Sequence, residues 1–541
     1  MPDAMSCTPS RWLCLAVAGA LGACSQAPDY PVRERDAGRE TDTDTARDVD
    51  AGPPRIEPKP WRPFARVLPP RSWIANGRYS VFSSPRTADL TGDGVLDVVV
   101  GHGIEVSPHD GEAPVDPEDI RTLGSVAAYD GRNGEVLWQF EAQQDMVGSA
   151  VFAQLNGDDV PDVVIGGRYA ELVALDGKRG DLLWRFFTDG TPAARAMGYH
   201  NFYSASVVGD HDGDGVADLI VANGGDATLG PTQPRPPGQL LALSGASGAL
   251  LGRIPMPDSR ETYMSTTLID GREPQLIFGS GGESWGGSLW RVPVSAVFAS
   301  DATRVKRLAS RDDTGFIAPA TLADLTGDGV LDIVASAFGG YLVVIDGATD
   351  AVRFEVELHG VESHSAPILA RVTEDGVPDI AWSVNVGAWP KYTGARYLLW
   401  DGASGELLMD ERWGGLAPCG HVAADLDGDG RDEILFGVNV VVGDITKAEL
   451  ALQLYLLDPL TLVAQPFGEQ FRRPAIATPW LGDLDGDGDL ELIVASSYIL
   501  TRSATYWLER YDLNAPLPAT PFSGAYMGSA YDGRWDVAAI R

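Results

Sequence analysis

Basic residues are scarce in this chain of 541 residues. Lys and Arg together number 41 against 76 Asp and Glu, which gives a formal net charge of −35 at pH 7. Proteins that bind nucleic acid or anionic lipid headgroups rely on clustered Lys and Arg to neutralise phosphate. The composition therefore argues against nucleic acid as a partner, and against attachment to a membrane through surface charge.

Long apolar runs are also missing, with one exception in residues 1–23. There Arg11 precedes an apolar stretch that is too short for an ordinary transmembrane helix and that ends in small residues. This pattern predicts a secretory signal peptide. The stretch LGAC, residues 21–24, resembles the bacterial lipobox, which implies lipid attachment at Cys24; an ordinary signal peptide cut nearby is the alternative. Ser25, rather than Asp, follows Cys24 and is compatible with transfer to an outer membrane.

Cysteine is nearly absent from the part of the chain that would remain after cleavage. Of four cysteines, Cys7 and Cys14 lie in the signal peptide and Cys24 would carry lipid, which leaves Cys419 alone. No intrachain disulfide is therefore expected. Rigidity must come from the core and from bound metal.

Large apolar residues are almost missing from residues 24–60, which are rich in charge, Pro, Gly and Thr. Such a segment cannot bury enough surface to offset its ordering entropy, so it is predicted to be a disordered acidic tether. The folded domain is expected over residues 61–541. We expect a monomer that is held in the cell envelope, at the outer membrane or the cell surface, and that touches membrane only through its lipid.

Catalytic signatures are missing as well. No GxSxG, HExxH or P-loop pattern occurs. His359 and His364 are the nearest approach to a histidine cluster, and we expect them to be ordinary hydrogen-bonded histidines. The sequence therefore predicts no enzyme.

What the chain has in excess is a short acidic pattern. Residues 483–491 read DLDGDGDLE, with carboxylates at positions 1, 3, 5 and 9 and Gly488 at position 6. Carboxylates crowded in this way repel one another unless a cation lies among them. An EF-hand loop opens with the same alternation of oxygen ligands and the same glycine. The pattern predicts a Ca²⁺ loop that leads into a buried strand.

Five copies keep this spacing, and each precedes an apolar run, so about five Ca²⁺ sites are expected. The predicted metal ligands are Asp89, Thr91, Asp93 and Asp97; Asp210, Asp212, Asp214 and Asp218; Asp324, Thr326, Asp328 and Asp332; Asp425, Asp427, Asp429 and Glu433; and Asp483, Asp485, Asp487 and Glu491. Three further copies lose ligands, around Gln154, Asp270 and Arg371. These should bind metal weakly or not at all, and the Arg371 guanidinium could occupy the place of the cation.

A second pattern alternates with the first. Segments such as AAYDGRNGEVLWQF (127–140) and VALDGKRGDLLWRF (173–186) read as strand, tight turn, strand. Each unit of about 50 to 60 residues thus supplies four short antiparallel strands, which is the blade of a β-propeller. Eight units predict an all-β propeller of eight four-stranded blades; seven remain an alternative if the unit at Asp270 has merged with a neighbour.

The acidic units resemble FG-GAP repeats, also described as VCBS-like repeats, which are known from the propeller heads of integrin α chains. The hairpins are similar to those of quinoprotein-like propellers. Together the two resemblances cover the chain from about residue 63 onwards. They imply a calcium-bearing propeller whose loops bind a partner, and they imply no particular reaction.

Strand order places the acidic loops and the DG turns on one face of the ring, and the remaining connections on the other. Long irregular loops on a rigid scaffold often carry function. The possible ligand face therefore contains His200, Tyr203, Trp285, Trp389 and Tyr392. These aromatic residues either cap the blades or bind a protein or glycan, in a binding or adhesion module. The alternative is a secreted propeller enzyme, either a quinone-dependent dehydrogenase or a polysaccharide lyase.

Overall fold

The computed structural model describes most of the predicted folded domain, namely residues 66–104, 124–186, 191–230, 232–389, 391–417, 420–442, 449–497 and 505–535. The predicted signal peptide, Cys24, the tether and Cys419 lie outside the described residues. Within those residues, no helix has both the length and the apolar character needed to span a membrane.

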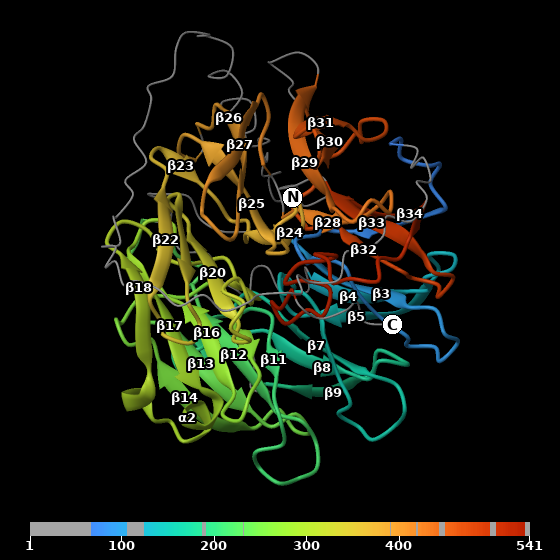
Figure 1. Ribbon diagram of the computed structural model, residues 1–541. Helices are drawn as coiled ribbons and strands as arrows, with labels where there is room; N and C mark the ends of the chain where they lie inside the picture. Colours follow the sequence, from blue (N-terminus) through green and yellow to red (C-terminus); the bar gives the residue numbers. More distant parts are fainter. Residues whose placement is uncertain are drawn as a thin grey trace, which may run out of the picture.

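Eight antiparallel sheets follow one another around a ring (Figure 1). The fold is therefore an all-β propeller with eight blades, as predicted. The unit at Asp270 forms a complete blade of its own, so the seven-bladed alternative is wrong. Helical structure in the described residues is limited to α1 (Thr191–Ala196), α2 (Val294–Phe298) and a 3-10 turn (Ala302–Arg304).

The first four blades follow the chain from the inner strand to the outer one. Blade 1 has β2 (Arg86–Ala88), β3 (Asp97–Gly103), β4 (Gly124–Tyr129) and β5 (Val136–Ala142); blade 2 has β6 (Val151–Ala153), β7 (Asp162–Gly166), β8 (Leu172–Leu175) and β9 (Leu182–Arg185); blade 3 has β10 (Asn201–Phe202), β11 (Ser206–Val207), β12 (Leu219–Gly224), β13 (Gln239–Leu243) and β14 (Leu250–Pro255); blade 4 has β15 (Thr267–Ile269), β16 (Gln275–Gly279), β17 (Gly287–Pro293) and β18 (Lys306–Arg311).

The last four blades repeat this order until the final strand. Blade 5 has β19 (Thr321–Ala323), β20 (Asp332–Ala337), β21 (Tyr341–Ile345) and β22 (Val352–Glu357); blade 6 has β23 (Val361–Glu362), β24 (Ile368–Ala370), β25 (Asp379–Val386), β26 (Gly394–Trp400) and β27 (Leu407–Trp413); blade 7 has β28 (Val422–Ala424), β29 (Glu433–Val442), β30 (Glu449–Asp458) and β31 (Val463–Pro466); blade 8 has β32 (Trp480–Gly482), β33 (Asp489–Ser497), β34 (Thr505–Pro516) and β1 (Trp73–Arg78).

Strand β1 closes the ring, because it pairs antiparallel with β34 from Trp73–Arg510 to Arg78–Thr505. From the sequence, the last unit supplies only three strands, so its fourth is expected either from the C-terminal tail or from the segment around residues 61–68. The N-terminal alternative is confirmed, although the strand begins at Trp73. Closure in this way removes the bare edges that an open sheet would present.

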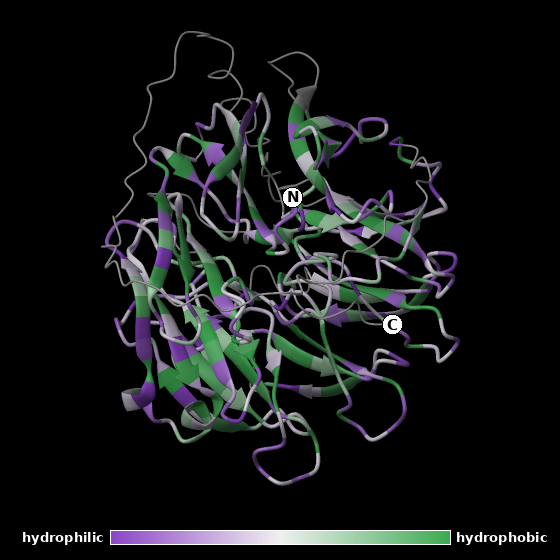
Figure 2. Cartoon of the chain, in the orientation of Figure 1, coloured by the Kyte–Doolittle hydropathy of each residue, from purple (hydrophilic) through white to green (hydrophobic). Residues whose placement is uncertain are grey.

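Burial explains why the middle strands read as apolar runs. Every residue of β3 is buried, whereas β5, at the outer edge, buries only Trp138 and Ala142. The described residues contain eight apolar clusters, and each joins the facing sheets of two consecutive blades. Figure 2 shows the apolar residues concentrated in the strands and the polar residues in the connections. The hydrophobic core is thus divided into clusters that each lie between two neighbouring blades.

Tryptophans of the outer strands connect three of the blades to the next blade. Trp138 Nε1 in blade 1 donates a hydrogen bond of 2.7 Å to the carbonyl of Gly177 in the hairpin of blade 2. Its ring lies against Gly180, where φ is +72° and a Cβ would stand only 2.7 Å from the indole. Trp184 and Trp73 make the same bond to the next blade. The DGxxGxxLW pattern therefore encodes contacts between blades as well as a turn.

Candidate functional site

The five acidic loops share one backbone form. The first carboxylate accepts hydrogen bonds from the amides that follow it: Asp89 binds the N–H of Gly92 at 2.7 Å and of Gly94 at 3.0 Å. The corresponding glycines bind Asp210, Asp324, Asp425 and Asp483 in the other four loops. Gly92 and Gly94 both have positive φ, of 74° and 84°, which favours glycine there.

The ninth position holds the loop to the DG hairpin of its own blade. One oxygen of Asp97 accepts the amides of Leu90 and Thr91 at 3.0 and 3.1 Å, and the other accepts the amide of Gly131 at 3.2 Å. The bond to the hairpin glycine recurs at Asp162, Asp218, Asp332 and Asp379. Because two of these belong to loops that have lost ligands, a ninth-position Asp serves the fold whether or not metal binds.

Three loops bring their predicted ligands together. In each, carboxylate oxygens from positions 1, 3 and 9 lie within 4.8 Å of one another: Asp210, Asp212 and Asp218; Asp425, Asp427 and Glu433; Asp483, Asp485 and Glu491. The position 5 carboxylates each use one oxygen to accept an amide two residues on, and they are Asp93, Asp214, Asp328, Asp429 and Asp487. In blades 1 and 5, Thr91 and Thr326 occupy position 3, so each of those loops has one carboxylate fewer.

In blades 7 and 8 the ninth residue is Glu instead of Asp. Glu433 is 1% exposed, and its Oε1 has no hydrogen-bond partner among the described residues, with Arg66 Nη2 at 3.7 Å. Burial raises the pKa of Glu433 to about 9 and that of Glu491 to about 8. Asp485 Oδ1 is also buried and has no hydrogen-bond partner in the described part of the chain. These buried hard oxygens fit Ca²⁺, which takes 6–8 oxygen ligands.

The three altered loops use their substituted residues differently. In blade 2, the Nδ2 of Asn156 donates to Asp162 and Asp176 at 3.1 Å each, so an amide group bridges the carboxylates. In blade 6, the expectation for Arg371 is wrong. Its guanidinium leaves its own loop and binds Asp432 of blade 7 at 2.6 Å, because that carboxylate is fully buried and needs a cation.

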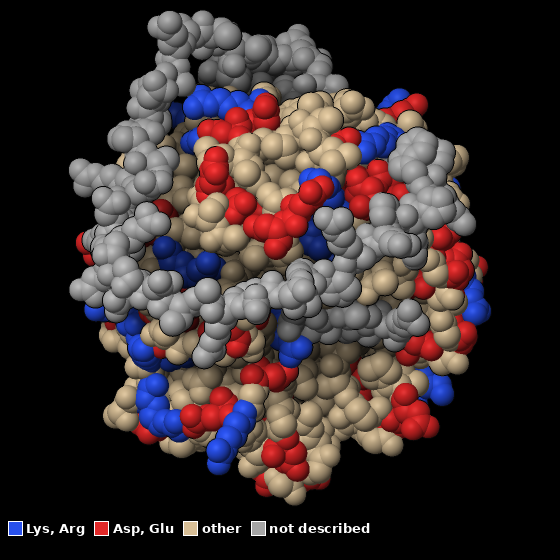
Figure 3. Space-filling view, in the orientation of Figure 1, with Lys and Arg blue, Asp and Glu red and all other residues tan. Residues whose placement is uncertain are grey.

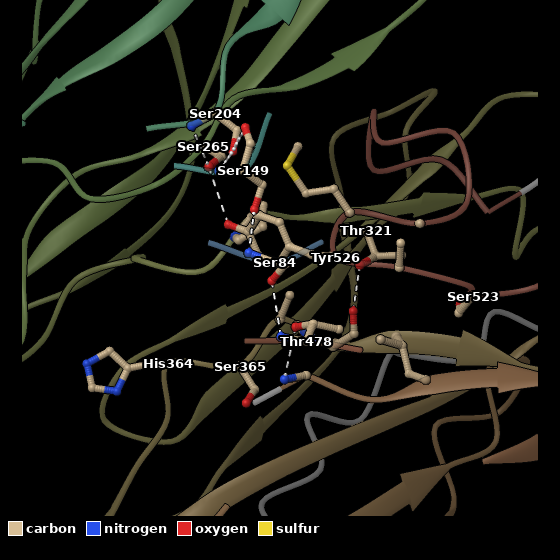
Figure 4. A pocket seen from close by; sticks show the side chains of 18 of the residues that line it. Ser84, Ser149, Ser204, Ser265, Thr321, His364, Ser365, Thr478, Ser523 and Tyr526 are labelled. Atoms are coloured by element: carbon tan, nitrogen blue, oxygen red, sulfur yellow. Dashed lines mark hydrogen bonds between the residues drawn. The ribbon is translucent and has the colours of Figure 1, made fainter. Parts of the chain in front are cut away.

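A chain of hydrogen bonds surrounds the central channel (Figure 4). In each step, a backbone N–H of one blade donates to the hydroxyl of the next, over distances of 3.0 to 3.3 Å. The steps are Gly420 to Thr478, Thr478 to Ser84, Ser84 to Ser149, Ser149 to Ser204, and Ser204 to Ser265. These bonds link six consecutive blades at the inner rim.

Residues 522–535, here called the axial segment, run across the end of the channel on the acidic-loop face. The segment lies near the middle of the ring in Figure 1 (dark red). Ser523 exchanges backbone hydrogen bonds with Ala423 of blade 7, and Leu322 of blade 5 exchanges them with Gly533 and Trp535. Arg534 binds Asp270 of the altered blade 4 loop at 2.5 Å. The axial segment therefore ties the blades together from inside.

Arg86 of blade 1 is wholly buried beneath this segment. Its Nη1 donates to the carbonyl of Ala150 at 2.9 Å, and its guanidinium lies 4.7 Å from the centre of the Tyr531 ring. Burial lowers the pKa of Arg86 to about 10. The axial segment thus covers a buried cation with an aromatic face.

A cavity of about 190 Å³ lies between the inner rim and the axial segment, lined by residues from all eight blades. Tyr203 and His364 line it on the face opposite the acidic loops, and Arg534 and Trp535 line it on the acidic-loop side. The side chain of His364 is 59% exposed, so the cavity reaches the surface beside it.

The predicted aromatic residues are divided between the interior and the mouth of this channel. His200 is buried, with Nδ1 3.7 Å from Asp226, and does not lie on an open surface. Tyr203 lines the cavity, and Trp285 is half-buried. Trp389 is 60% exposed, with its ring centre 5.9 Å from that of Tyr392, whose hydroxyl donates to Glu362 at 2.5 Å.

Charged pairs at the channel mouth were not anticipated from the sequence. Glu283 of blade 4 binds His364 of blade 6 at 2.8 Å, and Arg235 of blade 3 binds Glu261 at 3.3 Å. Burial raises the pKa of Glu261 to about 7. On the face seen in Figure 3, acidic and basic side chains lie side by side. These residues occupy separate connections, and no local spacing in the sequence signals that they pair.

Comparison with protein families matches residues 86–308 to the FAM234A/B β-propeller model, which is less than half of the chain. Comparison with curated proteins gives no match. The chain is thus a β-propeller protein by fold and by this partial match.

Solved structures share the fold at low sequence identity. Quinohemoprotein alcohol dehydrogenase from Comamonas testosteroni is 14% identical with a TM-score of 0.51, over 83% of this chain and 78% of that chain. Rhamnogalacturonan lyase YesW is 14% identical with a TM-score of 0.50, over 82% and 73%. Sqt1 from Saccharomyces cerevisiae is 11% identical with a TM-score of 0.50, over 82% and 99%. At these identities the likeness concerns the fold alone.

Proposed function

We propose that the protein is a calcium-stabilised, lipid-anchored binding module of the cell envelope, and that its ligand is a glycan held at the channel mouth. One observation carries the proposal: side chains from several blades meet around a cavity that opens on the face away from the acidic loops. Tyr203 and His364 line this opening. Glu283 connects His364 to blade 4, and Trp389 stands exposed on blade 6.

The shape of this region favours a glycan over a protein surface. Small-ligand sites are concave and combine aromatic walls with a few polar groups. A flat protein surface would not enter a cavity of about 190 Å³, whereas a sugar chain can place one ring inside and the next against an exposed aromatic side chain. Trp389 and Tyr392 offer that aromatic surface, and Glu362 fixes the Tyr392 hydroxyl.

Calcium would act on the opposite face. In blades 3, 7 and 8, the converging oxygens of positions 1, 3 and 9 would hold the ion, which neutralises buried carboxylates such as Glu433. In blades 1 and 5, a threonine hydroxyl would replace the position 3 carboxylate among the ligands of the ion. The metal supplies charge compensation and rigidity, and the residues at the channel mouth bind the ligand.

Glycan arrays and cell-surface protein pull-downs, both with calcium present, test the proposal. We expect glycan binding that Trp389→Ala weakens and that Leu460→Ala leaves unchanged. Leu460 is the matched control because it is also 60% exposed and lies in the β30–β31 hairpin on the acidic-loop face. Binding to a protein and to no glycan would contradict the choice of ligand. Turnover with a quinone cofactor and electron acceptor, or cleavage of polysaccharide, would favour the enzymatic alternative.

Lipid attachment is tested separately by metabolic labelling with a fatty acid. Label on the wild type and none on Cys24→Ala is expected. Label that persists in Cys24→Ala would contradict the lipid anchor and leave ligand binding unaffected.

A further inference from the structure

The hairpin of blade 7 lacks a backbone donor that most other blades have. In blades 1, 2, 3, 5 and 6, one oxygen of the ninth-position Asp accepts the amide of the hairpin glycine, as Asp97 does from Gly131. In blade 7 the residue at the corresponding place, after Asp458, is Pro459, which has no N–H. Glu433, the ninth residue of that loop, therefore has no hairpin amide to accept.

The side chain of Arg66 lies where that donor is missing. Its Nη2 is 3.6 Å from Asp427 Oδ2 and 3.7 Å from Glu433 Oε1, and its Nη1 contacts Asp458 Oδ2 at 2.5 Å. Only the contact with Asp458 is short enough for a hydrogen bond. Glu433 is 1% exposed, and its Oε1 has no hydrogen-bond partner among the described residues. Because buried polar atoms are nearly always hydrogen-bonded, this oxygen indicates a ligand that Arg66 does not replace.

Blade 2 shows that the first residue of the hairpin faces the centre of the acidic loop. There the Nδ2 of Asn156, at position 3, lies 3.1 Å from the ninth residue Asp162 and 3.1 Å from the hairpin residue Asp176. The two carboxylates thus converge on one nitrogen atom. Asp458 is the counterpart of Asp176 in blade 7, where position 3 is itself a carboxylate. Blade 7 therefore adds a fourth carboxylate that the spacing of the loop does not reveal.

Arg66 belongs to a segment that is held loosely. Residues 66–72 precede β1 of blade 8 and reach across to blade 7, and none of them is buried. Leu68 is the apolar anchor of this segment, since it packs against the core cluster of blades 7 and 8 beside Gly468. Segments with few buried contacts open at a low cost in free energy. Arg66 can therefore move without the unfolding of a blade.

The arginine of blade 8 provides a contrast. Arg510 contacts Asp485 of the blade 8 loop at 2.5 Å, but its side chain is only 6% exposed. Its Nη1 also donates to the carbonyl of Gly131 in blade 1 at 2.9 Å. This cation lies in strand β34 and is fixed by the sheet. Arg66, with a side chain that is 32% exposed, is the displaceable one.

We propose that Ca²⁺ and the guanidinium of Arg66 exchange at blade 7. The ion binds the carboxylates of positions 1, 3 and 9 together with Asp458 of the hairpin, and Arg66 moves away with residues 66–72. Ca²⁺ takes 6–8 oxygen ligands and so also satisfies Glu433 Oε1. This inference rests on the calcium sites of the proposed function.

The exchange gives calcium an effect beyond the stability of the loop. The predicted tether ends at residue 60, a few residues before Arg66. Docking of Arg66 on blade 7 holds the start of the folded domain against the propeller, and calcium releases it. Occupancy of this one loop thus sets how firmly the propeller is held to its tether.

Calorimetric titration of the full-length protein with CaCl₂ measures the competition. Arg66→Gln removes the guanidinium, and Asp458→Asn removes the hairpin carboxylate. Arg304→Gln is the matched control, because it removes an equal charge from blade 4, where Arg304 binds Glu273 at 2.6 Å. Asp427→Asn disables the blade 7 loop, so Arg66→Gln in that background identifies the site that responds. The melting temperature of every variant reports folding.

We expect Arg66→Gln to tighten one calcium site about tenfold or more, and Asp458→Asn to weaken that site by about the same factor. Arg304→Gln should leave every site within about twofold. The gain from Arg66→Gln should vanish in the Asp427→Asn background. In hydrogen-exchange mass spectrometry, calcium should speed the exchange of residues 66–72 about tenfold or more in the wild type and leave it unchanged in Asp427→Asn.

Four results would each overturn the inference and leave the calcium sites of the proposed function intact. They are calcium affinities that do not respond to Arg66→Gln, a gain that persists in Asp427→Asn, affinities that do not respond to Asp458→Asn, and exchange of residues 66–72 that calcium leaves unchanged or slows. A wild type that binds no calcium at all would contradict both the inference and the calcium sites.

Discussion

Asp270 and Arg534 lie 264 residues apart in sequence, and their side chains meet at 2.5 Å. Asp270 holds the first position of an altered acidic loop, and here it anchors the axial segment. Next to Arg534, Trp535 lies 5.8 Å from the guanidinium of Arg371, the first residue of another altered loop. Two loops that lack the full set of acidic ligands thus hold the segment that closes the channel.

Deletion of residues 517–541 should destabilise the propeller strongly. The deletion removes the buried Phe522, Ala525 and Met527, exposes the inner strands and uncovers Arg86. Full burial of a large apolar side chain contributes about 1.5–3 kcal/mol, so a loss of several kcal/mol in the free energy of unfolding is expected. Chemical denaturation followed by circular dichroism measures it. The control Asp270→Asn removes one partly exposed ion pair and should cost less than about 1 kcal/mol; equal stability of the truncated and full-length proteins would contradict the role of the segment.

Removal of calcium should lower the melting temperature. Ions that bind the folded loops alone stabilise by mass action, by about 2.7 kcal/mol per site at a hundredfold excess over Kd. Asp212→Asn should reduce the number of bound Ca²⁺ ions by one, measured by calorimetry and elemental analysis. Asp158→Asn is the matched control, because blade 2 has Gln154 at its first position. An unchanged melting temperature in EDTA would count against structural metal.

Asp379→Ala should destabilise the protein equally with and without calcium. Asp379 lies in the altered blade 6 loop and accepts the amides of Val372, Thr373 and Gly402. Their loss leaves buried donors unpaired and should cost about 3 kcal/mol in urea unfolding. Asp375→Ala, at an exposed position of the same loop, should cost less than about 1 kcal/mol. If the effect of Asp379→Ala disappeared in EDTA, the ninth residue would be acting through metal.

His102 should make the protein sensitive to acid. The buried ring stacks on Tyr506 with centres 3.9 Å apart, and burial lowers the pKa of His102 to about 3, from about 6.5 in the unfolded chain. The contribution of His102 to the free energy of unfolding is therefore fully present above pH 6.5. It is lost as the pH falls toward 3, because only the unfolded chain takes up the proton. Between pH 7 and pH 5 the wild type should lose about 2 kcal/mol more than His102→Phe.

Urea unfolding at pH 7 and at pH 5 measures this difference in the free energy of unfolding. His359→Phe is the control, since the His359 side chain is 63% exposed. A wild type and a His102→Phe variant with parallel pH profiles would show that the ring does not stay neutral in the folded state.

The local part of the fold was predictable from the sequence. The acidic loops and the DG turns are short patterns with fixed spacing, and each defines a turn between two strands, so their repetition gave eight blades and the strand order. The spacing could not show that Asp97 uses both oxygens on backbone amides. The indole hydrogen bond of Trp138 also escaped prediction, because its acceptor lies in the next blade.

Contacts across the channel could not be read from local patterns. Ser84, Ser149, Ser265 and Thr478 each stand five residues before the first position of an acidic loop, which is a signal that could have indicated the hydroxyl chain. Nothing in the neighbouring sequence indicates that Arg534 pairs with Asp270, or that His364 pairs with Glu283. His200 was grouped with the ligand face because its connection is long, yet the side chain turns inward toward Asp226.

The partnership of β1 with β34 has a consequence for the order of folding. Seven blades are built from neighbouring stretches of chain, whereas the eighth joins segments more than 400 residues apart, and the entropy lost on closing so long a loop exceeds that of any hairpin. Until this junction forms, the molecule is an open arc with an unpaired strand at each end. Such an arc can pair with the β1 of a second molecule. Refolding at high protein concentration should therefore yield strand-exchanged dimers before it yields monomeric rings.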